Sequence, residues 1–366
     1  MTARIYANRL RALRNALRQK KVHAFVLFTH ENDNKNVLYL SGFSGTSAIV
    51  LITKNAAFIG VDSRYTERAR IEAPHFTLVD IKSKQSFSDV INEALKGSSD
   101  KGIRKIGYEG FRVSVFTVKA WDKKISQKLV PLEDIVGKLR QYKSEDEIRA
   151  IRAACHATDK AFQEIRRRIR AGMREIEVAH DIDATLRRHG AIENGFSTIV
   201  ASGPNAAIPH HNTGDRRLRP GEPVVMDFGG RFKGGYCSDL TRTIFVPGKK
   251  PDPEMKHIYE IVLGANRAAF RALRPGITWK AYDGVARSYI EAQGYGEFFA
   301  HGLGHSLGLE AHDPYDYRND SIRVGTVFTN EPGIYLPGRG GVRIEDDLVL
   351  TRDGVKKLTM APYEEI

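Results

Sequence analysis

The segment Val224–Phe245, VVMDFGGRFKGGYCSDLTRTIF, is typical of a β-hairpin that carries one acidic residue on each side. An apolar run leads to Asp227, a turn rich in glycine follows, and Asp239 opens a second run of strand-forming residues. Because a hairpin folds back on itself, we expect the two aspartates to become cross-strand neighbours. Two unpaired carboxylates repel each other there, and an aspartate directly after a buried strand is costly unless it is neutralised. A bound cation resolves both problems.

A second hairpin is predicted over Val327–Leu350, VFTNEPGIYLPGRGGVRIEDDLVL, and it repeats this pattern. Glu331 follows an apolar strand, and Glu345 lies on the returning strand shortly after Arg343. Each acid alone could flank an exposed turn or pair with a nearby arginine such as Arg242. Two matched hairpins favour a shared site, because four carboxylates suit two hard or borderline divalent cations.

Histidines supply further candidate ligands. His301 and His305 lie four positions apart in HGLGHSLGLEAH, where glycines disfavour a helix, and extended backbone would point both to one side. His312 follows seven positions later, and the pair His210–His211 precedes the first hairpin. Mixed carboxylate and imidazole ligands, without a thiolate motif, favour Mn, Co, Fe or Zn over Ca or Mg. The chemistry that this set indicates is hydrolysis assisted by two metal ions.

The rest of the chain indicates two domains, 1–139 and 140–366. The first alternates short strands and helices and is predicted to be α/β. The second is predicted to begin with a long helix capped by Ser144 and Glu147. Two pairs of helices, each followed by a hairpin, suggest an internal duplication in this second part. The expected strands are Val22–Phe28, Ala48–Thr53 and Ala57–Val61, and the further helices are Phe87–Leu95, Glu175–His189, Pro253–Leu273 and Trp279–Gln293.

Composition excludes several classes of protein. The chain has 366 residues with 41% hydrophobic and 28% charged residues, which is ordinary for a globular protein. Only two cysteines occur, so a disulfide scaffold is excluded, and we expect Cys155 to belong to the core. No apolar run approaches the roughly 18 residues of a membrane-spanning helix. The net charge of +13 favours acidic partners, but it is spread along the chain, and nucleic-acid binding is not expected.

The N-terminus is basic, with no acidic residue before Glu31, which resembles a transit peptide. A first helix packed on a first strand explains the same residues better, because apolar residues recur there at helical spacing. We therefore expect a cytoplasmic protein.

These motifs resemble those of the pita-bread metallopeptidases, and most of all the Xaa-Pro aminopeptidase and prolidase branch. The resemblance covers essentially the whole chain. It rests on Asp227…Asp239-Leu-Thr-Arg-Thr, His301-Gly-Leu-Gly-His305, Glu331-Pro-Gly-Ile-Tyr335, Gly341-Val-Arg-Ile-Glu345-Asp and the loop Ser202–His210. Tyr39–Gly45 and Asp62–Tyr65 resemble the creatinase-like N-terminal domain of the same branch. The fold implied is a creatinase-like α/β domain followed by an α+β pita-bread domain with a pseudo-twofold internal duplication.

The resemblance also implies roles for individual residues. Asp227, Asp239, His305, Glu331 and Glu345 would bind two divalent ions per chain, Mn first and Co, Zn or Fe as alternatives, and Glu331 would also help activate water. His210 and His312 would position substrate and stabilise the transition state. His301 would help form the pocket for the proline side of the scissile bond. Arg343 and Tyr335 would hold the ligands in place.

The activity implied is hydrolysis of an Xaa-Pro bond at the N-terminus of a peptide with proline in second position, by a homodimer. Prolidases often carry an arginine soon after the His312 equivalent to hold the carboxylate of a dipeptide. Here Arg318 is the first arginine after His312, which favours an aminopeptidase over a strict Xaa-Pro dipeptidase. A non-catalytic binding protein on the same fold is a distant alternative, which the intact ligand set disfavours.

Overall fold

The computed structural model describes residues 3–31, 34–82, 85–317 and 321–365. The chain divides into two compact units, Met1–Leu139 and Arg140–Ile366. Within the described residues, no helix has both the length and the apolar character that crossing a membrane requires.

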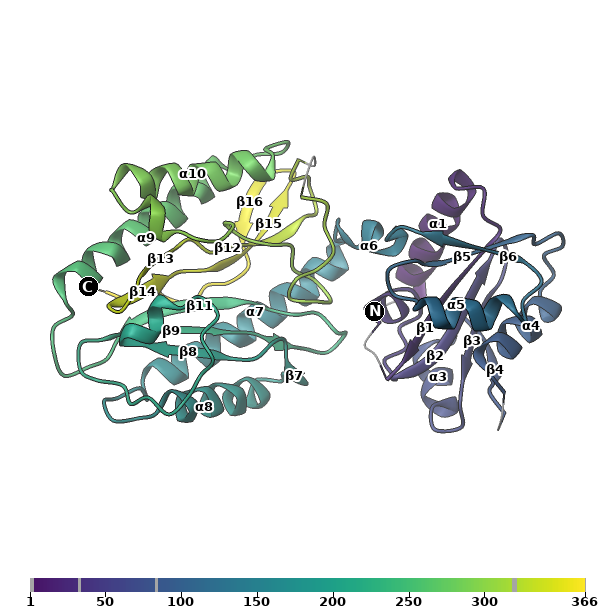
Figure 1. The fold of residues 1–366 in the computed structure, drawn as a ribbon, viewed down its shortest axis with the longest axis horizontal. Coiled ribbons are helices and arrows are strands. Elements are labelled where there is room, and N and C mark those ends of the chain that lie inside the picture. Colours follow the sequence, from purple (N-terminus) through teal and green to yellow (C-terminus); the bar gives the residue numbers. More distant parts are fainter. Residues whose placement is uncertain (1–2, 32–33, 83–84, 318–320, 366) are drawn as a thin grey trace. The chain divides into compact units, whose positions relative to one another are not determined.

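The first unit is built on one six-stranded mixed sheet with the strand order β4-β3-β2-β1-β5-β6 (Figure 1). Strands β1, β2 and β3 pair antiparallel, whereas β4, β5 and β6 join as parallel strands. The strands are β1 Ala24–His30, β2 Ser47–Thr53, β3 Ala57–Val61, β4 Thr77–Asp80, β5 Lys105–Glu109 and β6 Lys128–Leu132. The helices are α1 Ala3–Gln19, α2 Lys35–Ser41, α3 Thr66–Glu72, α4 Phe87–Gly97 and α5 Val115–Asp122, and α6 Ile135–Arg140 follows at the boundary.

Strand β1 begins two residues later than the sequence pattern suggests. The backbone N–H of Val22 still donates to the carbonyl of Leu17 at the end of α1 (3.1 Å), and Lys21 takes a positive φ of 54°. Val22 is therefore buried as part of the turn that ends the helix, and not as part of the sheet.

The second unit contains two helix pairs, each with its own apolar core against antiparallel strands. Figure 1 shows α7 and α8 on one side of these strands and α9 and α10 on the other. The long helix α7 begins at Glu145 after the predicted capping box, in which Ser144 and Glu147 bond to each other's backbone. The helices are α7 Glu145–Arg166, α8 Glu175–Arg188, α9 Pro253–Ala272 and α10 Trp279–Ala292, with 3₁₀ turns η1 Gly203–Ala207 and η2 Gly296–Phe298.

The two predicted hairpins account for β9 to β15, and β7 pairs with β10 in a separate two-stranded sheet. In the first, β9 pairs with β11, and β8 adds to the other edge of β9. In the second, β12 pairs with β15, and β13 pairs separately with β14. The strands are β7 Glu193–Asn194, β8 Ile199–Ser202, β9 Pro223–Phe228, β10 Gly230–Arg231, β11 Leu240–Phe245, β12 Val327–Asn330, β13 Gly333–Leu336, β14 Gly340–Arg343, β15 Asp346–Thr351 and β16 Gly354–Lys357.

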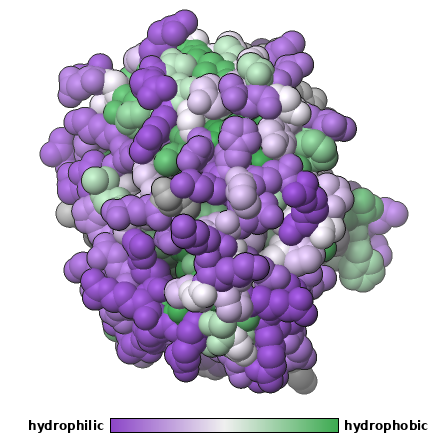
Figure 2. All heavy atoms as spheres, turned by 90° about the vertical axis from the view of Figure 1, so that its left-hand side faces the viewer, coloured by the Kyte–Doolittle hydropathy of each residue, from purple (hydrophilic) through white to green (hydrophobic). Residues whose placement is uncertain are grey.

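The face of the molecule shown in Figure 2 is mostly hydrophilic, and its apolar side chains are scattered among polar ones. Such a surface is typical of a protein face in contact with water.

Candidate metal centre

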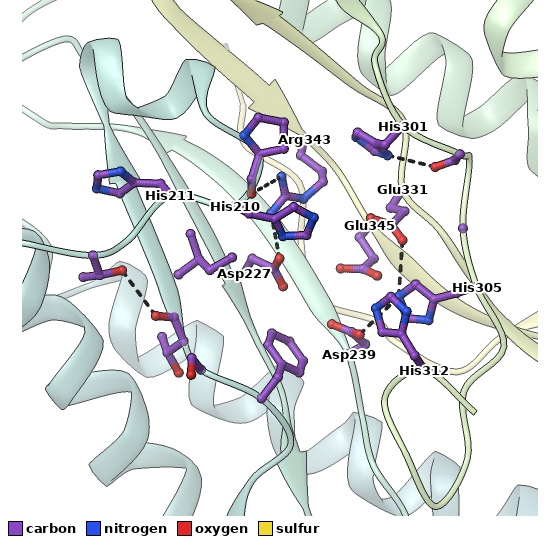
Figure 3. Close-up of a pocket in the computed structure, with 18 of the residues that line it drawn as sticks. His210, His211, Asp227, Asp239, His301, His305, His312, Glu331, Arg343 and Glu345 are labelled. Carbon is purple, nitrogen blue, oxygen red and sulfur yellow. Dashed lines mark hydrogen bonds and ion pairs between the residues drawn. The ribbon is translucent and has the colours of Figure 1, made fainter. Parts of the chain in front are cut away.

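A cavity of about 520 Å³ in the second unit collects nearly all of the predicted site residues (Figure 3). Tyr335 alone among them does not line it. The predicted residues at the cavity are His210, Asp227, Asp239, His301, His305, His312, Glu331, Arg343 and Glu345.

Three of these residues form the tightest group. Ligand atoms of Asp239, His305 and Glu345 all lie within 4.8 Å of one another. The Nε2 atom of His305 is 3.7 Å from Asp239 Oδ2 and 3.4 Å from Oε1 of Glu331. The fourth predicted carboxylate, Asp227, forms an ion pair with Arg343, in which Nη2 of the arginine lies 2.6 Å from Oδ2 of the aspartate.

The first hairpin places its aspartates differently from a simple cross-strand pair. Asp227 on β9 pairs with Thr241 on β11, so Asp239 lies two positions further along, diagonal to Asp227. The expectation of neighbouring carboxylates holds only in this offset form. The offset leaves Thr241 between the acids, where its hydroxyl donates to Glu345 Oε2 (2.8 Å).

The second hairpin is interrupted at the two glutamates. The pair Asn330–Asp346 ends one ladder and the pair Gly333–Arg343 begins the next, so Glu331 and Glu345 face each other at the break. The backbone N–H of Glu345 donates to the carbonyl of Thr241 (3.0 Å), which joins this break to the first hairpin. The two hairpins therefore meet where their acids lie.

Arg343 holds several groups around the cavity in fixed positions. Besides Asp227, its Nε donates to Thr241 Oγ1 (3.1 Å) and its Nη1 to the hydroxyl of Tyr335 (3.0 Å). That hydroxyl lies 2.7 Å from His301 Nε2. Tyr335 is buried, and burial raises its pKa to about 12, so it acts as a neutral hydroxyl group. A chain of contacts thus links His301 to Asp227.

Burial controls the protonation of the carboxylates in the cluster. It raises the pKa of Asp239 and Glu345 well above the ordinary value of a carboxyl group, and repulsion from neighbouring carboxylates raises both further. Burial also raises the pKa of Glu331. The Oδ1 atom of Asp239 is buried and has no hydrogen-bond partner among the described residues. A divalent cation would satisfy this atom and offset the repulsion, so the donor set fits a metal.

His301, His305 and His312 are held in the neutral form, which can bind a metal. The rings of His305 and His312 stack with centroids 3.7 Å apart and planes 15° apart. Burial lowers the pKa of His305, and it lowers the pKa of His312 to about 4, with a further contribution from the adjacent imidazole of His305. Burial lowers the pKa of His301 as well.

The side chains of His210 and His211 point in different directions, and a buried carboxylate holds His211 in its place. Figure 3 shows His210 pointing toward the carboxylates and His211 pointing away from them. His211 Nε2 lies 2.9 Å from Oε2 of Glu175, which is fully buried at the start of α8. Glu175 also accepts from the backbone and hydroxyl of Ser202 (both 2.7 Å) and from Asn205 (3.0 Å). Glu175 therefore anchors both ends of the loop that carries His210.

A second buried acid lies behind the cluster. Oδ2 of Asp347 accepts from the backbone N–H of Asp239 (2.9 Å) and from the thiol of Cys155 (3.2 Å). Cys155 is buried in α7, as its sequence pattern predicts, but it is also bonded to this acid. Asp347 and Glu175 are the residues near the site that sequence reasoning missed. Arg318, considered as a possible carboxylate-binding residue, lies outside the described residues.

Each of the two units matches a known protein family. Residues 149–352 match metallopeptidase family M24, and residues 9–142 match the Creatinase/Prolidase N-terminal domain. The chain is 37% identical over 337 residues to the Xaa-Pro dipeptidase of Pyrococcus horikoshii, covering 91% of this chain and 92% of that protein. It is 35% identical over 364 residues to an uncharacterised peptidase of Bacillus subtilis, covering 98% of this chain and 99% of that protein.

Solved structures show the same relationship. The Xaa-Pro dipeptidase from Bacillus anthracis superposes with a TM-score of 0.91 at 35% identity, over 99% of both chains. The X-Pro aminopeptidase from Thermotoga maritima superposes with a TM-score of 0.88 at 36% identity, over 96% of this chain and all of that one. These matches confirm the creatinase-like and pita-bread fold, and the chain belongs to metallopeptidase family M24.

Proposed function

We propose that this chain hydrolyses the bond between the first residue of a peptide and a proline in second position, using two divalent metal ions. The observation that carries the proposal is the group of buried acids around His305 at an accessible cavity. Similar proteins are Xaa-Pro dipeptidases and an X-Pro aminopeptidase, and these activities indicate the substrate class.

Asp227, Asp239, His305, Glu331 and Glu345 are the residues proposed to hold the ions, with Mn first and Co, Zn or Fe as alternatives. When bound, divalent ions polarise the scissile carbonyl and make a water molecule more acidic. Mixed carboxylate and imidazole donors favour these metals over Ca or Mg.

The protein side chains supply the remaining chemistry. Glu331 accepts a hydrogen bond from the Thr329 hydroxyl (3.1 Å), and its raised pKa makes it a better acceptor for the proton of the attacking water. A neutral His312 can donate an N–H to negative charge that develops on the carbonyl oxygen. His210, which points to the same carboxylates, is proposed to orient the substrate. His301, fixed by Tyr335, is proposed to border the proline ring.

The length of the preferred peptide distinguishes two candidate activities. We propose an Xaa-Pro aminopeptidase, with Xaa-Pro dipeptidase as the second candidate. The aminopeptidase is favoured because a further cavity adjoins the first and gives room for residues beyond proline.

The test is hydrolysis of Ala-Pro, Ala-Pro-Ala and Ala-Ala-Ala by protein loaded with each metal in turn. The proposal expects release of alanine from the proline peptides, much slower cleavage of Ala-Ala-Ala, and loss of turnover when the N-terminus is acetylated. The variant Glu331→Gln is the control for a contaminating peptidase. Absence of Xaa-Pro cleavage with Mn, Co, Zn and Fe would contradict the proposal.

We also propose that the chain acts as a cytoplasmic homodimer. Both cysteines are buried thiols, which fits a reducing compartment. Phe111, four residues before α5, and Val115 and Phe116 at its start are 57%, 71% and 84% exposed, and a second copy could cover these apolar side chains. Light scattering should give twice the chain mass, and Phe116→Asp should shift it toward the single chain. A wild-type protein of one chain mass would contradict the dimer.

A further inference from the structure

The loop that carries His312 is tied to a buried group of charges outside the proposed metal site. Asp313, the next residue, accepts from Arg140 Nη2 (2.5 Å) and from Lys143 Nζ (3.1 Å). Arg140 is the last residue of α6, and Lys143 lies shortly before α7. The side chains of all three are only 1% exposed. We call Arg140, Lys143 and Asp313 the Asp313 cluster.

We propose that the Asp313 cluster positions His312 for catalysis, so that its three members act through this histidine and do not touch the substrate. The inference rests on the proposed Xaa-Pro hydrolysis, in which His312 donates an N–H to the carbonyl oxygen. It adds positioning residues to that function and assigns them one target.

The Asp313 carboxylate closes the loop 306–313 on itself. Its Oδ1 accepts from the backbone N–H of Glu310 (3.1 Å), and the backbone N–H of Asp313 donates to the carbonyl of Ser306 (2.8 Å). Lys143 reaches the start of the same loop, because its Nζ also donates to Ser306 Oγ (3.3 Å). The cluster therefore fixes the backbone on both sides of His312.

The imidazole of His312 depends on this backbone for its position. Its ring stacks on that of His305, with centroids 3.7 Å apart, and it forms no hydrogen bond to a residue that the structure describes. Aromatic contacts tolerate a range of offsets, so stacking alone does not set where the N–H points. A displacement of Asp313 would move the adjoining His312 directly.

The proposed metal ligand His305 is anchored in a different way. Its backbone N–H donates to Thr329 Oγ1 (2.9 Å), and its carbonyl accepts from the backbone N–H of Thr329 (2.9 Å). These two bonds fasten His305 to β12 without help from the Asp313 cluster. Loss of the cluster should therefore displace His312 while metal binding is kept.

A purely structural role explains the cluster less well. Buried ion pairs add little stability compared with well-packed apolar residues of similar volume. Burial alone would raise the pKa of Asp313, but the charges of Lys143 and Arg140 hold that pKa below its usual range. The carboxylate therefore stays charged, and charge-assisted hydrogen bonds to it impose a definite geometry on the loop.

The experiment measures kcat and KM for Ala-Pro-Ala, together with the Kd for Mn²⁺, in the wild type and in a His312→Ala background. Lys143→Met removes one charge of the cluster, Lys143→Arg keeps it, and Asp313→Asn removes the shared carboxylate. Lys143→Met leaves Asp313 with its arginine partner, so the test remains possible if Asp313→Asn fails to fold. Arg166→Met is the control, because Arg166 pairs with Glu364 (3.4 Å) in the same unit and does not line the catalytic cavity.

In the wild-type background, Lys143→Met and Asp313→Asn should each lower kcat by about 10–100-fold, the range for residues that orient a catalytic group. The Kd for Mn²⁺ should stay close to the wild-type value, and Lys143→Arg should recover part of the loss. In the His312→Ala background the same substitutions should lower kcat by less than about threefold, because the group through which they act is gone. Arg166→Met should leave kcat unchanged in both backgrounds.

Equal losses of kcat in the two backgrounds would overturn the inference, and so would variants that lose Tm but keep wild-type kcat. A loss of Mn²⁺ binding large enough to explain the lower kcat would overturn it too, since the cluster would then act on the metal site. In each of these cases Xaa-Pro hydrolysis by the wild type would stand. A wild type that cleaves no proline peptide would instead contradict the proposed function itself.

Discussion

At the scale of single residues, the cluster concentrates buried acids that cannot all be charged without a counter-ion. The pKa of Asp239, Glu331 and Glu345 is raised by burial, and Asp239 keeps an unpartnered oxygen among the described residues. A structural core gains nothing from such an arrangement, because well-packed apolar residues are at least as stable. The arrangement is explained by a bound cation.

Glu331→Gln keeps the size of the side chain but removes its negative charge. We expect kcat/KM for Ala-Pro-Ala to fall by several orders of magnitude, because the water, the base and the metal ions act as a unit. His312→Ala should cost less, about 10²–10⁴-fold, as for a single acid–base or electrostatic group. Steady-state kinetics under saturating metal measure both. Near-full activity in His312→Ala would remove that residue from the proposed site.

Substitution of Glu175 tests whether this residue contributes to catalysis by positioning the loop of His210. Glu175→Ala removes the acceptor for Ser202, Asn205 and His211, and each buried donor left unpaired costs about 1–3 kcal/mol. We expect kcat to fall by roughly 10–100-fold because His210 loses its fixed loop, whereas Glu175→Gln should recover part of this loss. Glu260→Gln, at an exposed acid of α9, is the control. Variants that lose stability but keep wild-type kcat would limit Glu175 to a structural role.

At the scale of elements, the hairpins and helices follow from local sequence, whereas their exact pairing does not. The capping box of Ser144 and the apolar period of α7 are local signals, and both predict the observed helix. The second hairpin divides into two ladders because Pro332 has no N–H to donate, between Glu331 and the start of β13. The offset of Asp227 and Asp239 depends on the turn, where Gly234 and Gly235 take positive φ values that many turns would allow.

The residues that sequence reasoning missed share one feature. Glu175 contacts Ser202 and His211 across 27 and 36 positions, and Cys155 contacts Asp347 across 192. No periodicity or motif spacing encodes such contacts, because they arise only when helices α7 and α8 pack on the strands. The acids on the hairpins were predictable because each lies within or directly beside an apolar strand segment.

The contribution of the capping box at the start of α7 to stability can be measured with a single substitution. Ser144→Ala removes the side-chain acceptor of the capping box, whose hydroxyl accepts from Glu147 N (3.5 Å). We expect the free energy of unfolding to fall by about 0.5–2 kcal/mol, measured by urea denaturation. Ser288→Ala, at an exposed position within α10, should be neutral or slightly stabilising, since alanine favours helices. Equal effects of the two substitutions would show that the cap contributes nothing.

At the scale of the whole molecule, metal binding and stability should be linked. A ligand at 100 times its Kd stabilises the folded state by about 2.7 kcal/mol, which raises the Tm of a unit of this size by roughly 5–10 °C. We expect Mn²⁺ to raise the Tm of metal-free protein by this amount. Asp239→Asn should leave the metal-free Tm unchanged or higher, because it relieves repulsion, and should reduce the Mn²⁺ shift. A metal shift equal to that of the wild type in this variant would exclude Asp239 as a ligand.

The most direct measurement is a titration of exhaustively chelated protein with Mn²⁺, following both bound metal per chain and hydrolysis of Ala-Pro-Ala. We expect no turnover at the start, a rise in turnover as metal binds, and saturation at two ions per chain. Full activity in the chelated protein, or saturation without any hydrolysis of the Xaa-Pro bond, would contradict this expectation.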